Sequence, residues 1–180
     1  MNYYCLSCKT TAESKLKVNL DNYFLKTCPS NFFRSCFPLK NGKIKKQGQY
    51  LTSKTALMPG HIFIETDIEL QEYNGEITKL FTNAFGLLRY KKDDYKLKND
   101  DIKFALQMFS YGKVIEPTKV IRFTNLEAGE KIRVVSGPLE KVTGRIISVY
   151  KNTKVKVEVE FMGSKTTVQF PIDVVETIED

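Results

Sequence analysis

The sequence lacks the residue patterns on which most enzymes depend. It has a single histidine, and it contains neither a glycine-rich loop that cradles phosphate groups nor the turn that carries a hydrolase nucleophile. Paired acids occur at Asp93-Asp94 and Asp100-Asp101, but such pairs are typical of a charged turn and of the first turn of a helix. We therefore expect no enzymatic activity and no cofactor.

Long apolar runs are also missing. No stretch of about 18 apolar residues occurs, so the sequence predicts no membrane-spanning helix and no membrane partner. The first residues, MNYYCLSCKTT, do not combine a basic start with a long apolar segment, so we expect no secretory signal. The expected location is the cytoplasm.

The cysteines are too few, at four in 180 residues, for a disulfide scaffold. Cys5 and Cys8 form one Cys-x-x-Cys pair, and Cys28 and Cys36 follow at uneven distances. Cys5 and Cys8 fall in one predicted strand, where residues three apart point to opposite faces. We expect reduced thiols and no metal site.

The chain does have ample apolar material and an uneven distribution of charge. Hydrophobic residues make up 42%, which is enough for real cores. The net charge is +7, and residues 126–180 hold 8 Lys/Arg against 9 Asp/Glu, which leaves 20 against 12 in residues 1–125. A basic segment attracts phosphate backbones, although ordinary solvated lysines would give the same count.

Residues 1–112 alternate between strand and helix patterns. A strand is predicted over 3–8, followed by a helix over 11–26 that Thr10 and Glu13 begin as a capping box. Asn41-Gly42 predicts a tight turn in an exposed basic arm, and the third helix starts at Asn99 and buries Ile102, Ala105, Leu106 and Phe109. The other predicted elements are strands over 31–39, 61–65 (central in the sheet) and 85–90, and a helix over 70–80 interrupted at Asn74-Gly75. This order predicts an α+β sandwich.

Residues 126–180 show tight β periodicity. Strands are predicted over 132–135 and 145–150, joined through Gly137-Pro138 and Gly144, where both glycines can take a positive φ. Residues 154–161 alternate apolar and charged positions, and 166–170 and 174–175 supply the last strands. Five short strands in this length predict a small barrel, with a linker over 113–125.

Several of these stretches resemble the NusG family of transcription factors. Residues 57–64, LMPGHIFI, resemble the family's Phe-Phe-Pro-Gly-Tyr strand, and residues 83–87, NAFGL, resemble its Asn-Thr-Pro-Gly-Val stretch. Residues 137–144 and 161–163 resemble the loops of its KOW motif. The resemblance covers about residues 2–178 and implies a NusG-type α/β sandwich over 1–112, a linker over 113–125 and a five-stranded SH3-like KOW β-barrel over 126–180.

The sequence also departs from the family pattern. Leu57 and Met58 stand where the family has phenylalanines, His61 replaces an aromatic residue, and Phe85 replaces a proline. These departures indicate a specialised paralogue of the RfaH or LoaP type, and residues 112–118 resemble the LoaP linker.

The resemblance implies a monomeric transcription elongation and antitermination factor whose N-terminal domain binds the clamp helices of RNA polymerase and suppresses pausing. Carried over by position, the polymerase-binding candidates are Tyr3, Met58, Pro59, His61, Phe81 and Phe85. The alternative for each is an ordinary place in the core.

The resemblance also supplies nucleic-acid and partner candidates. The basic arm, with Lys40, Lys43, Lys45, Lys46 and Lys54, could approach upstream DNA or the polymerase, and Asn83 and Arg89 could touch non-template DNA. In the KOW domain, Lys141, Arg145, Lys151 and Lys154 could meet nascent RNA, or could form only a polar face. Leu139, Val142, Phe161 and Met162 match positions that contact a ribosomal protein or a termination factor.

A second hypothesis is a ribosomal or other structural RNA-binding KOW protein. Ribosomal KOW proteins lack the Pro59-Gly60 strand within an α+β domain, so the N-terminal domain is the feature that separates the two hypotheses.

Overall fold

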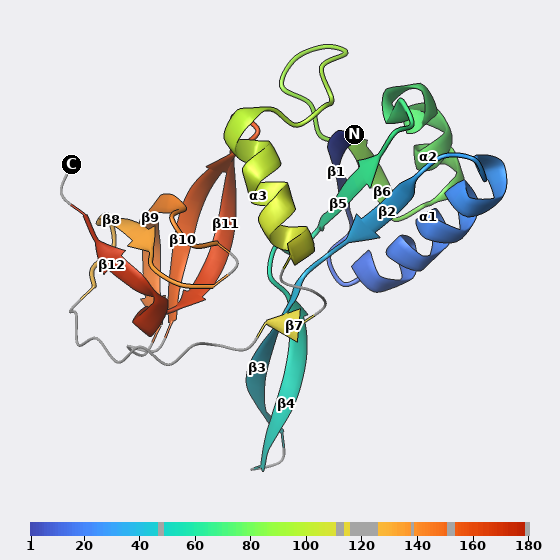
Figure 1. Ribbon diagram of the computed structural model, residues 1–180. Helices are drawn as coiled ribbons and strands as arrows, with labels where there is room; N and C mark the ends of the chain where they lie inside the picture. Colours follow the sequence, from blue (N-terminus) through green and yellow to red (C-terminus); the bar gives the residue numbers. More distant parts are fainter. Residues whose placement is uncertain (47–48, 111–113, 116–125, 138, 151–153, 179–180) are drawn as a thin grey trace.

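The computed structural model describes residues 1–46, 49–110, 114–115, 126–137, 139–150 and 154–178. Side chains are described for these residues except 41–46, 49–53, 55, 114–115 and 173. Two antiparallel sheets with helices between and beside them make up the bulk of the chain, and a long hairpin projects from the junction (Figure 1).

The N-terminal sheet has the strand order β2-β5-β1-β6. Its strands are β1 (Asn2–Cys8), β2 (Phe33–Cys36), β5 (His61–Thr66) and β6 (Ala84–Leu87), and every pair is antiparallel. The central position predicted for the Ile62-Phe63-Ile64 strand is confirmed, since β5 and β1 are the two inner strands. Period-two alternation therefore sends successive side chains of β1 and β5 into two different layers.

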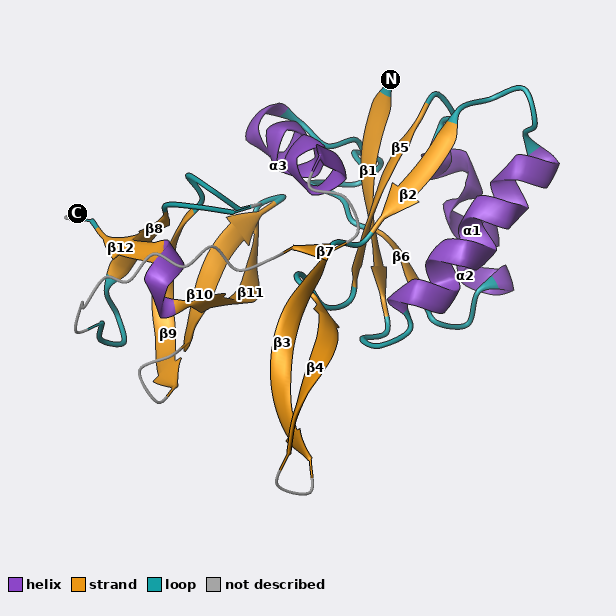
Figure 2. Cartoon of the chain, turned by 60° about the horizontal axis from the view of Figure 1, so that its bottom comes forward, coloured by secondary structure: helices purple, strands orange, loops and turns teal. Residues whose placement is uncertain are grey.

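Helices α1 (Glu13–Thr27) and α2 (Asn74–Leu80) cover one face of this sheet (Figure 2). Leu16, Leu20 and Phe24 of α1 pack there, and the Phe24 ring stacks on Phe33 at 4.4 Å between centroids. The 3₁₀ helix η1 (Leu70–Tyr73) precedes α2, so the predicted interruption at Asn74 is confirmed.

The start of α1 differs from the prediction. Its N-cap is Ala12, and no side chain caps the helix, so the predicted capping box of Thr10 and Glu13 is wrong. The Glu13 carboxylate instead accepts a hydrogen bond of 2.8 Å from the backbone N–H of Gly60. A tertiary partner has replaced the local one, and it ties α1 to the loop before β5.

Helix α3 (Asn99–Ser110) covers the other face of the N-terminal sheet. Its buried residues are Phe104, Ala105 and Met108. The prediction that Leu106 is buried is wrong, because that side chain is 43% exposed. The helix packs between two sheets (Figure 1), so its buried arc cannot be read from one amphipathic stripe.

Strands β3 (Leu39–Lys46) and β4 (Gln49–Ala56) form the projecting hairpin, which confirms the predicted arm. The tight turn predicted at Asn41-Gly42 is wrong, since these residues pair with Lys54 and Ser53 inside the ladder. Strand β7 (Val114–Ile115) pairs in parallel with β3 at Leu39 and Lys40. It lies within the predicted linker, whose other residues are outside the described part of the chain.

The C-terminal sheet has the order β11-β10-β9-β8-β12. Its elements are β8 (Lys131–Val134), β9 (Thr143–Tyr150), β10 (Lys154–Phe161), β11 (Ser164–Pro171), the 3₁₀ helix η2 (Ile172–Val174) and β12 (Val175–Thr177). The five predicted strands are confirmed. No closed barrel is seen among the described strands, because β11 and β12 remain at opposite edges.

The two glycines of the predicted hairpin play different roles. Gly137 has φ +92°, as predicted. Gly144 does not take a positive φ, so its conformational freedom is not used there. A Cβ atom at Gly144 would lie 2.5 Å from the carbonyl oxygen of Glu158, so this glycine permits close approach of β9 to β10.

Cys5 and Cys8 point to opposite faces of β1, as their spacing predicts. Cys5 packs in the cluster that contains α3, and Cys8 packs in the cluster beneath α1. Among the described residues, no group of three His, Cys, Asp or Glu side chains gathers in a way that could hold a metal ion. In the same part of the chain, no helix is both long enough and apolar enough to cross a bilayer.

Candidate functional site at the seam between the sheets

The two sheets meet along an apolar seam, which we define by Phe63 of β5, Phe104 of α3, and Phe161 and Met162 at the end of β10. The ring of Phe161 lies 5.6 Å from Phe63 and 5.1 Å from Phe104, and Phe63 and Phe104 lie 5.7 Å apart between centroids. Tilted and edge-on aromatic contacts of this kind are favourable beyond their burial. One aromatic triad thus joins both halves of the chain.

Two polar contacts cross the seam. The backbone N–H of Met162 donates to the Asp101 carboxylate at the start of α3, at 3.3 Å. The Lys40 ammonium, at the root of the hairpin, donates to the main-chain carbonyl of Gln169 in β11 at 2.8 Å. The contacts hold the C-terminal sheet against α3 at one end and against the hairpin at the other (Figure 1).

A polar cluster anchors the end of α3 to the N-terminal sheet beside the seam. The Tyr3 hydroxyl donates to Glu65 at 2.7 Å, and Arg34 pairs with the same carboxylate. The guanidinium of Arg34 also lies 4.5 Å from the centre of the Phe109 ring. The hydrogen bond to Glu65 is the main cause that raises the pKa of Tyr3. Helix α3 is therefore attached to the N-terminal half by contacts that do not involve the C-terminal sheet.

The six polymerase-binding candidates do not form one surface. Tyr3 and Met58 face the layer between the sheets, and Met58 is only 1% exposed. Pro59 precedes β5 and His61 is its first residue, and Pro59 is exposed. Phe81 packs on the opposite layer, against Tyr23, and Phe85 of β6 is 66% exposed.

The pKa of His61 tests how deeply the N-terminal end of β5 is buried. Burial lowers the pKa of His61 below its usual 6.5, and the hydrogen bond from its ring to the Pro59 carbonyl and the charge of Glu13 offset this only in part. The folded chain then binds fewer protons near pH 6 than the unfolded chain. The free energy of unfolding is expected to fall as the pH drops through 6.5, and the contribution is fully present above that value.

Because His61 is the only histidine, its ring resonances in an NMR titration need no further assignment. We expect a midpoint below that of the urea-unfolded chain, which serves as the control. A folded midpoint equal to or above the unfolded one would contradict the enclosed position.

The four predicted KOW partner positions are largely buried. Leu139, Phe161 and Met162 are buried and Val142 is half-buried. Phe161 and Met162 belong to the seam itself. In this conformation, two of the predicted partner positions are therefore covered by β5 and α3 of the N-terminal half.

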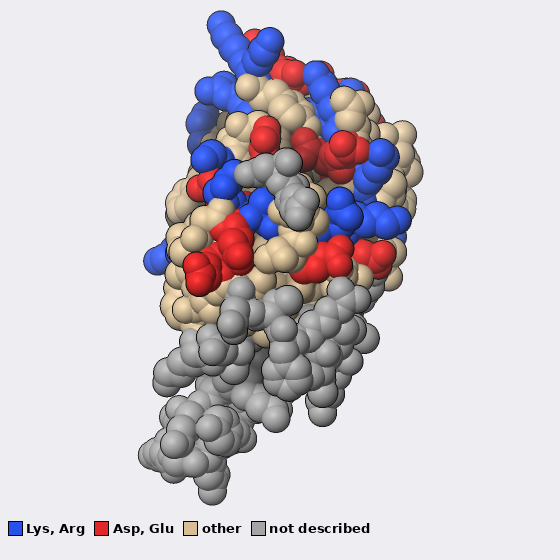
Figure 3. All heavy atoms as spheres, turned by 90° about the vertical axis from the view of Figure 1, so that its left-hand side faces the viewer, with Lys and Arg blue, Asp and Glu red and all other residues tan. Residues whose placement is uncertain are grey.

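The predicted nucleic-acid contacts are scattered over both halves. Asn83 is half-buried, while Arg89, Lys141, Arg145 and Lys154 are exposed. Arg145 donates to the main-chain carbonyl of Gly129 at 2.8 Å. The side chains of Lys43, Lys45 and Lys46, and all of Lys151, lie outside the described part. On the face that carries the C-terminal sheet, basic and acidic side chains are interspersed (Figure 3).

The aromatic triad was not among the predicted sites. Phe63 and Phe161 each sit in a strand pattern that predicts only core, and Phe104 falls outside the predicted buried face of its helix. The one available signal was that Phe161 ends an alternating strand directly before Met162-Gly163, which places a large apolar side chain at the tip of a hairpin.

Comparison with known proteins covers both halves of the chain. No protein-family model matches it. It is 24% identical over 176 residues to the transcription termination/antitermination protein NusG of Thermus thermophilus, with 94% of each chain covered. It is 26% identical over 186 residues to NusG of Staphylococcus carnosus, covering 98% of this chain and 95% of that one. Over nearly its whole length, the chain is therefore similar to NusG proteins.

The fold is similar to that of a solved NusG structure. A solved structure of Thermotoga maritima NusG, described for its domain interaction, superimposes with a TM-score of 0.63 and 21% identity over 99% of this chain and 97% of that one. The predicted NusG resemblance is thus confirmed, while the specialised paralogue type stays a prediction.

Proposed function

We propose that this NusG-family chain is a transcription termination/antitermination factor that acts by binding RNA polymerase, without catalysis. The curated relatives bear that functional name and cover nearly the whole chain. This coverage of the α+β half favours the proposal over a ribosomal RNA-binding protein.

The observation that carries the proposal is the apolar layer on the face of the N-terminal sheet that is turned toward the C-terminal sheet. Phe63, Met58 and Phe104 would present a continuous apolar surface if the C-terminal sheet moved away. Such a surface suits an amphipathic helix, which is the chemistry expected of the polymerase clamp helices. Release of Phe161 and Met162 would at the same time free the C-terminal sheet to recruit nascent RNA or a protein.

Phe85 supplies a test that leaves the fold intact. It is 66% exposed on the edge strand β6, so a polar residue there costs the core little. If Phe85 contacts polymerase, the full-length Phe85→Ser variant should bind purified polymerase about five- to tenfold more weakly, a loss of about 1 kcal/mol.

Leu25→Ser is the matched control, since Leu25 is 70% exposed on α1, away from the seam. It should change polymerase affinity less than about twofold while shifting the melting temperature as little as Phe85→Ser does. Equal affinities for both variants and the parent would remove Phe85 from the polymerase-binding candidates. A full chain that neither binds polymerase nor alters pausing would refute the function.

A further inference from the structure

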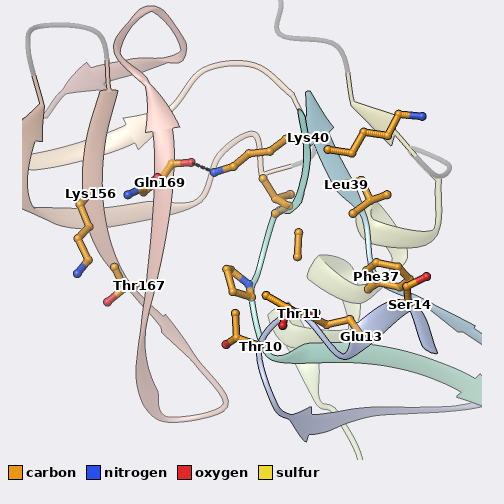
Figure 4. A pocket seen from close by; sticks show the side chains of 14 residues that line it. Thr10, Thr11, Glu13, Ser14, Phe37, Leu39, Lys40, Lys156, Thr167 and Gln169 are labelled. Atoms are coloured by element: carbon orange, nitrogen blue, oxygen red, sulfur yellow. Dashed lines mark hydrogen bonds between the residues drawn. The ribbon is translucent and has the colours of Figure 1, made fainter. Parts of the chain in front are cut away.

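A cleft of about 670 Å³ lies where the C-terminal sheet meets the root of the hairpin. One side comes from β10 and β11 and the other from the loop before α1 and the bases of β3 and β4 (Figure 4). Among the residues that line it are Lys156, Thr167 and Gln169 on the first side, and Thr10, Lys40 and Lys54 on the second. Its size is typical of ligand sites, which often lie between packed units.

The charge of the cleft is predominantly positive. Lys40, Lys54 and Lys156 line it, and within the described part of the chain none of them forms an ion pair. Glu13 also lines the cleft and accepts the Gly60 N–H, so three lysines stand against one carboxylate there. Glu158 lies two residues from Lys156 on the same face of β10, and it pairs with Lys165 at 2.7 Å.

Lys40 is the best-placed cation. It reaches across the cleft to the Gln169 carbonyl, as Figure 4 shows, and uses one of its three donors there. Burial, followed by the charge of Lys154, lowers the pKa of Lys40 to about 8. An anion in the cleft would therefore favour the charged form of Lys40, which burial and the charge of Lys154 disfavour.

The sequence extends this positive character away from the cleft. Beyond Lys40, strand β3 continues with Lys43, Lys45 and Lys46 toward the tip of the projecting hairpin. The first residues of β3 line the cleft, so a compact anion would match the cleft alone, whereas a chain of phosphates would also match the lysine-rich sequence that continues along the strand.

We propose that this cleft binds the sugar–phosphate backbone of a single-stranded nucleic acid, held by lysines from both sides of the seam. The inference rests on the proposed function only in taking nucleic acid as a partner. Because Lys156 comes from one half and Lys40 and Lys54 from the other, the bound strand favours the closed seam. Binding of the nucleic acid and exposure of the Phe63–Phe104 surface then oppose each other.

The test measures the binding of a short fluorescent oligonucleotide, as RNA and as DNA of the same sequence, to the full chain by anisotropy at several salt concentrations. The double variant Lys54→Gln/Lys156→Gln should bind about tenfold more weakly. Its slope of log K against log salt should be smaller by about 1.4, the value for two lost single-strand phosphate contacts. The form that binds more tightly, RNA or DNA, identifies the source of the backbone.

The matched control is Lys26→Gln/Lys79→Gln, which removes the same charge from α1 and α2 on the far face of the N-terminal sheet. It should stay within about twofold of the parent. Unchanged binding by Lys54→Gln/Lys156→Gln would overturn the proposal, because the cleft lysines would then contribute nothing. An equal loss in the control would also overturn it, because the loss would then follow from total charge and not from the cleft.

A second test measures oligonucleotide binding by a variant in which the seam is open. Phe104→Ala, which removes one ring of the triad without touching the cleft, should weaken oligonucleotide binding once scattering shows that it has opened the seam. Tight binding by an opened variant would overturn the proposal. If the oligonucleotide results fail while Phe85→Ser still weakens polymerase binding, only this inference falls and the proposed function stands.

Discussion

Phe161→Ala is expected to separate the two sheets while both remain folded. Phe161 is 1% exposed and contacts the rings of both Phe63 and Phe104 across the seam. Truncating a buried phenylalanine typically costs about 3–5 kcal/mol. Here most of that cost falls on the closed arrangement, because the partner rings belong to the other half of the chain.

Small-angle scattering should show a larger radius of gyration for Phe161→Ala than for the parent, and affinity for polymerase should rise because the Phe63–Phe104 surface is free. The size of the rise depends on how strongly the parent favours closure. A cost of about 3 kcal/mol shifts a closed-to-open ratio by about a hundredfold.

Phe33→Ala is the control for simple loss of stability. Phe33 stacks on Phe24 in the layer beneath α1, away from the seam, so this variant should melt earlier without expanding. Phe104→Ala removes the opposite side of the contact and should expand the molecule as Phe161→Ala does. A lowered melting temperature with unchanged scattering in both seam variants would show that the triad does not hold the halves together.

Gly144→Ala is expected to disrupt the C-terminal sheet. The added Cβ would meet the Glu158 carbonyl oxygen at 2.5 Å and the Val157 Cγ1 at 2.6 Å. The first is backbone of the paired strand, so relief requires β9 and β10 to move apart near the register shift between Lys156 and Val157. Overpacking of this kind costs about 1–3 kcal/mol, and more where backbone must move.

The measurement is chemical unfolding followed by circular dichroism and amide exchange. Exchange should accelerate in β9 and β10 while β1 and β5 keep their protection. Gly75→Ala is the contrasting variant, because a Cβ there meets nothing within 4 Å and the residue lies in α2. It should be neutral or stabilising by up to about 1 kcal/mol. Equal stability of Gly144→Ala and the parent would refute the close approach.

Local patterns predicted most of the fold because each acts within a few residues. The alternation over 154–161 specified β10, and the Asn74-Gly75 interruption specified the boundary between η1 and α2. The capping box failed because Glu13 found a stronger tertiary partner in the Gly60 N–H. Asn41-Gly42 failed as a turn because a longer ladder was available to β3 and β4.

The site was less predictable because it is made by contacts between distant segments. Phe63, Phe104 and Phe161 come from three separate elements, and nothing within any one of them shows that it faces the others. The buried arc of α3 was misplaced for the same reason. Its surroundings include a sheet that the helix sequence alone does not reveal.

The alternation in β1 and β5 has an evolutionary consequence. Tyr4, Leu6, Ile62 and Ile64 face the layer beneath α1, whereas Cys5 and Phe63 face the seam layer. Of two neighbouring positions in one strand, one therefore packs in the core beneath α1 and the other packs in the layer that joins the two sheets. Related chains can strengthen or weaken closure by exchanging every second residue, while selection for folding acts on the residues between them.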